Sequence, residues 1–141
     1  MVVALIQLGA RSCRAVGQGR LSGFCPEGTE ATAQALGAAG LERAYLTHYG
    51  ALCGGEAVQD AARQVGAGAR AFEGMATQAH CLHMKGALLE NHLAEEIGEW
   101  ARQRAGAQAG AEGLETAAAL AAGGLARLVG RWQATDGRME S

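Results

Sequence analysis

The sequence predicts an all-α protein, an antiparallel helical bundle organised around one long helix. Between residues 70 and 104, apolar residues recur at alternating steps of three and four, which places them along one stripe of an α-helix. A shorter stripe of the same kind runs from 111 to 133, after a small-residue loop at 105–110. Because this loop is short, we expect the last helix to pack back along the long one. The long stripe consists of Phe72, Met75, Ala79, Leu82, Gly86, Leu89, Leu93, Ile97 and Trp100.

Two further helices are predicted before the long one. Thr29 is a suitable N-cap for a first helix that ends near Ala39. Apolar residues at helical spacing predict a second helix over residues 41–53, which the glycine pair at 54–55 ends. No segment alternates between apolar and polar residues for long enough to predict a sheet.

The long helix has a predicted extension and a predicted weak point. Its apolar stripe stays in phase back to residue 56, so one continuous helix over 56–104 would be about 70 Å long at 1.5 Å per residue. Gly66 and Gly68 lie in its interior, and we expect a break or kink there because paired glycines weaken a helix.

The N-terminal segment, residues 1–26, differs in composition from the rest of the chain. It is amphipathic and acid-free, and it bears Arg11 and Arg14 among its three arginines. This composition is typical of a mitochondrial targeting segment. Two other interpretations are peripheral contact with an anionic membrane through residues 1–20 and an arm that docks on a partner protein. The organisation is therefore an arm at 1–26, a helical bundle domain at 27–134 and a polar tail at 135–141.

Composition limits the classes of function. The net charge of −2 gives no reason to expect a nucleic-acid partner. No apolar run reaches the 18 or more residues of a membrane span, and nothing resembles a secretory signal, so the protein is predicted not to be secreted. The N-terminal segment predicts a mitochondrial location, and the alternative is the cytoplasm. The four cysteines form no C-x-x-C pair and are predicted to be reduced core residues. Only six residues are aromatic, so the core is predicted to be thin and completed by other chains.

Side chains able to bind a metal gather on the long helix. Spacings of three and four place His80, His83 and Met84 on one patch, and His92 about two turns further on with two glutamates. Imidazole and thioether groups suit copper or haem iron, and imidazole with carboxylate suits zinc or iron. The alternative interpretation is a solvated helix face with uninvolved histidines. Further candidates elsewhere in the chain are His48, Cys53 and Glu73.

No catalytic or cofactor motif is complete, so the sequence favours a non-catalytic accessory or structural subunit of a multiprotein assembly, without a cofactor. Its partners would be other protein subunits, bound through helix–helix contacts. Two alternatives remain: a metal- or haem-binding bundle that acts as an electron carrier or oxidase, and a small protein inhibitor or adaptor. The predicted interface residues are Phe72, Trp100, Trp132, Arg11 and Arg14.

Overall fold

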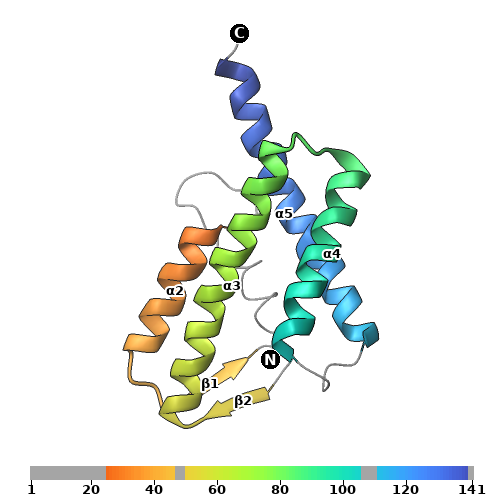
Figure 1. The fold of residues 1–141 in the computed structure, drawn as a ribbon. Coiled ribbons are helices and arrows are strands. Elements are labelled where there is room, and N and C mark those ends of the chain that lie inside the picture. Colours follow the sequence, from red (N-terminus) through yellow and green to blue (C-terminus); the bar gives the residue numbers. More distant parts are fainter. Residues whose placement is uncertain (1–24, 47–49, 106–110, 140–141) are drawn as a thin grey trace.

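A computed structural model describes residues 25–46, 50–105 and 111–139 of the chain, which form four helices and one two-stranded hairpin. Successive helices run in opposite directions, so the predicted all-α antiparallel bundle is confirmed (Figure 1). Residues 1–24 of the predicted N-terminal arm, with Arg11 and Arg14, lie outside the described residues. The elements in chain order are α2 (Pro26–Ala38), β1 (Arg43–Leu46), β2 (Gly50–Cys53), α3 (Gly55–Cys81), α4 (Gly86–Ala105) and α5 (Ala111–Met139).

Helix α2 begins four residues earlier than predicted. Pro26 occupies the first helical position, where its fixed φ favours a helix and its missing N–H loses no hydrogen bond, and Cys25 is the N-cap. Thr29, the predicted N-cap, instead lies inside the helix and is buried, and its hydroxyl has no hydrogen-bond partner among the described residues. The Thr29 prediction is therefore wrong, because the proline sets the start of the helix.

The helix predicted over residues 41–53 is also wrong. Strands β1 and β2 pair antiparallel there, with Arg43 opposite Cys53 and Tyr45 opposite Ala51. Gly40 and Gly54 flank the hairpin with positive φ values of 64° and 100°, a conformation that residues with a Cβ rarely adopt. The two strands are four residues each, too short for their period to be told from that of a helix. Both strands pack against α3.

The predicted long helix is two helices, and its break is not at the expected glycines. Helix α3 runs through Gly66 and Gly68 and ends at Cys81, and α4 begins at Gly86. Both interior glycines are buried, and a Cβ on Gly68 would lie 3.3 Å from the Trp100 ring. Gly68 therefore allows the close approach of α3 and α4 rather than breaking α3.

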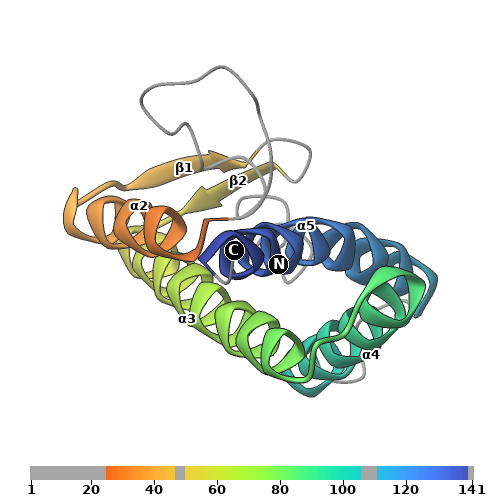
Figure 2. The same cartoon turned by 90° about the horizontal axis from the view of Figure 1, so that it is seen from above.

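The core lies between α3, α4 and α5, which form three sides of a triangle when viewed from above (Figure 2). Helix α5 packs antiparallel along α4, as predicted, and continues to Met139, six residues beyond its predicted end at 133. Helix α2 packs on α3, outside this triangle. The buried core consists of Ala69, Phe72, Ala76, Ala79, Leu89, Leu93, Ile97, Ala117, Ala118, Ala122, Leu125, Leu128 and Val129.

Candidate functional site

The turn between α3 and α4 contains two of the four predicted metal-binding residues, His83 and Met84, and His80 lies just before it at the end of α3. The His83 N–H donates to the His80 carbonyl at 3.0 Å, and the Met84 N–H donates to the Ala79 carbonyl at 3.1 Å. These two bonds define a Schellman motif, in which the residue after the C-cap takes a left-handed conformation. Here that residue is His83, with φ 53°, where glycine is the usual choice. The motif ends α3 and reverses the chain into α4.

His80 joins the end of α3 to the end of α5. Its Nε2 lies 2.9 Å from Asp136 Oδ2, and its ring meets the Trp132 ring edge-on at 5.7 Å between centroids. Its Nδ1 is buried without a hydrogen-bond partner among the described residues. The Nε2–H thus donates to the carboxylate, and this bond fixes the orientation of the imidazole.

The other predicted ligands, His83, Met84 and His92, have different environments. His83 is exposed, whereas Met84 is half-buried against the core and its carbonyl accepts a hydrogen bond of 2.9 Å from Gln133 Nε2. His92 lies on α4, with its Nε2 3.9 Å from Glu96 Oε1. Within residues 25–46, 50–105 and 111–139, no three His, Cys, Asp or Glu side chains are grouped so that they could hold a metal ion. Metal or haem binding stays a prediction of the sequence.

The remaining sequence candidates are widely separated along the chain. His48 lies outside the described residues, and Cys53 lies in β2, at the opposite end of α3 from His80. Three described cysteines, Cys25, Cys53 and Cys81, are free thiols. Cys53 and Cys81 are exposed, so their prediction as core residues is wrong. Cys53 lies in the hairpin and Cys81 at the end of α3, so neither thiol belongs to the apolar stripe that packs in the core.

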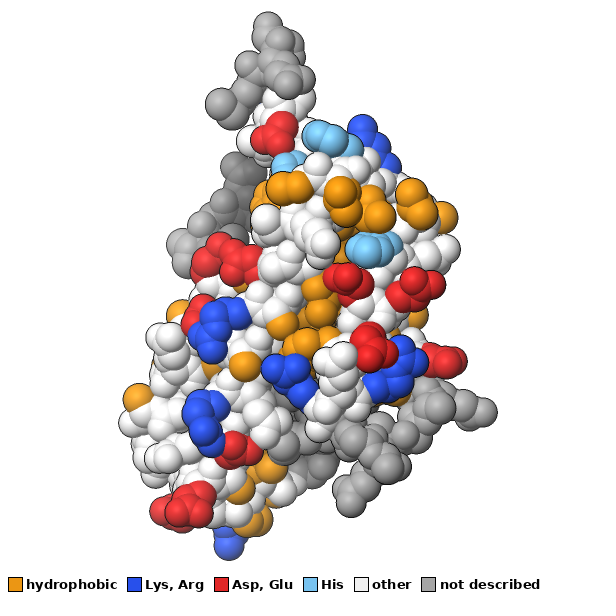
Figure 3. All heavy atoms as spheres, viewed as in Figure 1, with side chains coloured by type: hydrophobic (Ala, Val, Ile, Leu, Met, Phe, Trp, Pro, Cys, Tyr) orange, Lys and Arg blue, Asp and Glu red, His pale blue; other side chains and the backbone are white. Residues whose placement is uncertain are grey.

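Two leucines are exposed at the α3–α4 turn. Leu82 is 58% exposed and Leu88 is 66% exposed. Figure 3 shows hydrophobic side chains gathered with histidines at this end of the bundle. Leu82 belongs to the predicted stripe, but the turn removes it from the core. The exposure of Leu88 could have been predicted from the sequence, because Leu88 is a large apolar residue outside the stripe of α4.

The predicted interface residues lie mostly in or beside the core. Phe72 is buried and meets Trp100 edge-on, with 5.2 Å between ring centroids. Trp100 and Trp132 are half-buried against the same core, and the Arg104 guanidinium lies over the Trp100 ring at 4.3 Å. Arg11 and Arg14 lie outside the described residues. Contact of these side chains with a partner stays a prediction.

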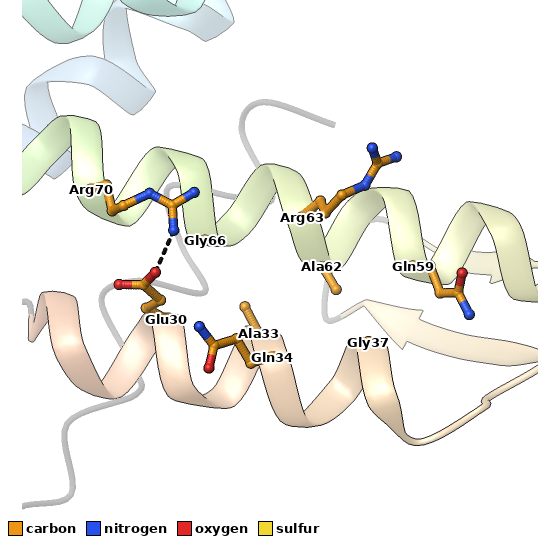
Figure 4. A pocket seen from close by; sticks show the side chains of 9 residues that line it. All are labelled: Glu30, Ala33, Gln34, Gly37, Gln59, Ala62, Arg63, Gly66 and Arg70. Carbon is orange, nitrogen blue, oxygen red and sulfur yellow. Dashed lines mark hydrogen bonds and ion pairs between the residues drawn. The ribbon is translucent and has the colours of Figure 1, made fainter.

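Helices α2 and α3 also border a groove of about 510 Å³. Small residues make its buried surface, and Figure 4 shows the Arg70 side chain reaching across to pair with Glu30, while Arg63 points away from α2. Because the ion pair neutralises the charges of Arg70 and Glu30, the groove offers mainly amide groups over a small apolar floor. The lining consists of Glu30, Ala33, Gln34, Gly37, Gln59, Ala62, Arg63, Gly66 and Arg70.

Comparisons with known proteins add no identification. No protein-family model, curated protein or solved structure matches this chain. Among the described helices, none has the length and apolar character needed to cross a membrane. The fold therefore defines the class, an all-α helical bundle, and the surfaces of the bundle carry the functional argument.

Proposed function

We propose that this protein is a non-catalytic structural subunit of a larger protein assembly, which it joins through contacts between helices. The observation that carries the proposal is the number of large apolar side chains that the fold leaves uncovered. Full burial of such a side chain stabilises a complex by about 1.5–3 kcal/mol. Those at least 37% exposed among the described residues are Leu36, Leu41, Tyr45, Leu82, Leu88 and Leu120.

The thin core supports the same proposal. Six of the thirteen buried core residues are alanine, which buries little apolar surface. Helix α2 and the hairpin pack on α3 and add no residue to this core. An isolated two-stranded hairpin is marginal in water, and here the contacts of both strands with α3 support it. A partner that covers α2 and the hairpin would add to these contacts.

A mitochondrial location is a second part of the proposal, and it rests on the acid-free, arginine-bearing composition of residues 1–26. A full-length fluorescent fusion should co-localise with mitochondria, and replacing Arg11 and Arg14 with Glu should disperse it. An unchanged distribution of the double variant would contradict the targeting role of these arginines. A matched control replaces Arg127 and Arg138, two exposed arginines of α5, with Glu.

The experiment that tests the assembly is native mass spectrometry of the protein isolated under mild conditions from its source cells, with elemental analysis of the same sample. We expect a complex with other chains at fixed stoichiometry and without stoichiometric metal. A monomer that unfolds cooperatively with the stability of an ordinary domain of this size would contradict the proposal. A small homo-oligomer with stoichiometric iron, copper or zinc would instead favour the metal-binding alternative.

A further inference from the structure

We propose that the α3–α4 turn is a docking surface for an amphipathic helix of a partner protein, one whose apolar face is bordered by carboxylates. We call this the turn surface and define it by its exposed residues Leu82, His83, Lys85 and Leu88. The proposal rests on the proposed function and specifies where on the bundle a partner binds. Three independent features of the turn support it.

The first feature is the exposure of two leucines on a fixed backbone. Leu82 and Leu88 flank the turn and are both more than half exposed. The turn between them is held by the Schellman bonds and by the Gln133 side chain, which donates to the Met84 carbonyl at 2.9 Å. Because the backbone is held in place, little conformational freedom is lost when the leucines enter a partner's apolar face.

The second feature is the conformation of His83. It has φ 53°, and a side chain with a Cβ is disfavoured there relative to glycine. The histidine makes no contribution to the buried core, since it is exposed. A non-glycine residue in this conformation, on a surface that also exposes two leucines, indicates that the His83 side chain contacts a partner.

The third feature is charge. Residues 80–89 contain no Asp or Glu, and Lys85 lies between the two leucines in the chain. Among the described residues no ion pair involves Lys85: the Asp136 carboxylate contacts His80 instead, and Glu90 lies about 200° around α4 from Leu88 at 100° per residue. The remaining acids of α4 begin about two turns further on, at Glu95. Carboxylates beside the partner's apolar face would therefore complement this surface.

Other occupants fit the turn surface less well. A second copy of the same surface would bring Lys85 against Lys85, and like charges disfavour such contacts. An anionic membrane is usually bound by a long helix face with several basic and apolar residues, and two leucines with one lysine are fewer than such a face presents. An amphipathic helix presents apolar residues three and four positions apart along one face, and such a face can cover two leucines without a deep groove.

The test uses the full-length protein in its source cells, tagged and isolated under mild conditions, with the fraction in complex measured by native mass spectrometry. Replacing both Leu82 and Leu88 with Ser should lower that fraction at least about tenfold, as for the loss of an interface hot spot. Lys85→Glu should lower it similarly, and Lys85→Arg should preserve it. The matched control is Ala119→Ser on α5, an exposed small residue outside the set of uncovered large apolar side chains, and it should leave the complex intact.

The outcomes separate this proposal from the proposed function. If the wild-type chain forms no complex, the proposed function fails, and this proposal fails with it. If the wild type forms a complex that survives the double serine variant, the turn surface alone is overturned. A complex strengthened by Lys85→Glu would also overturn it, because the partner would then be basic. Sedimentation of wild type, but not of the double variant, with phosphatidylserine vesicles would identify a membrane as the occupant instead.

Discussion

Two stretches of the same predicted helix behave in opposite ways. At Gly66 and Gly68, where local propensity favours a break, α3 continues without interruption. At residues 82–85, which contain neither glycine nor proline, the helix ends and the chain reverses. Propensity alone therefore misplaces the break by about four helical turns at 3.6 residues per turn.

The difference shows what decides a helix end in this fold. The glycines are buried where α3 meets its neighbours, and the missing side chain of Gly68 gives room to the Trp100 ring. Close packing there compensates the roughly 1 kcal/mol that a helical glycine loses relative to alanine. At the turn, ending the helix lets α4 bury Leu89, Leu93 and Ile97 in the shared core. A straight helix would carry these three residues away from it.

The largest expected effect is the difference between two leucines of the predicted stripe, Leu82 before the α3–α4 turn and Leu89 after it. Leu89 is 4% exposed, so Leu89→Ala should lower the free energy of unfolding by about 2–5 kcal/mol, as measured by denaturant titration. Leu82→Ala is the matched control and should change it by less than about 0.5 kcal/mol. Equal losses in the two variants would mean that the helix is continuous.

Overpacking tests the interpretation of the glycines. A Cβ on Gly68 would meet Trp100 at 3.3 Å, whereas a Cβ on Gly74 in the same helix would meet nothing within 4 Å. Gly68→Val should therefore destabilise the fold by about 1–3 kcal/mol, and Gly74→Val should change it by less than about 0.5 kcal/mol. Denaturant titration with tryptophan fluorescence measures both. Similar losses of stability in the two variants would contradict the interpretation that Gly68 makes room for the Trp100 ring.

Replacing His83 with glycine changes the free energy of unfolding in opposite directions for a left-handed residue 83 and for a continuous helix. In the Schellman motif, His83→Gly should stabilise the fold by about 1–2 kcal/mol, because glycine adopts the left-handed conformation without a Cβ clash. His83→Ala is the control and should give no such gain. In a continuous helix, glycine would instead be about 1 kcal/mol less stable than alanine. Thermal or denaturant unfolding of the two variants decides between these conformations.

The smallest expected effect concerns the bond from Gln133 to the turn. Gln133→Ala leaves the Met84 carbonyl without this donor and should lower the free energy of unfolding by about 0.5–1.5 kcal/mol. Hydrogen exchange of the amides at residues 82–85 should rise in the same variant. Gln103→Ala removes an exposed bond to Glu99 on α4 and serves as control. Equal effects of the two variants would show that α5 does not hold the turn.

Much of the fold was accessible from periodicity alone, whereas the surface was not. The spacing of Leu89, Leu93 and Ile97 predicted their burial, and the stripe after residue 111 predicted α5. The hairpin was missed because four-residue strands are too short to show a period. The exposure of Leu82 was missed because the turn that exposes it depends on where α5 offers its Gln133 and Asp136 side chains.

The sequence by itself determined that the protein is a helical bundle with a small-residue core, because amphipathic spacing fixes which side of each helix must leave water. Only the tertiary structure decided where the long stripe is cut and which apolar side chains remain outside. Those outcomes depend on contacts between residues some fifty positions apart in the chain, such as Gln133 with Met84, and no local pattern encodes them.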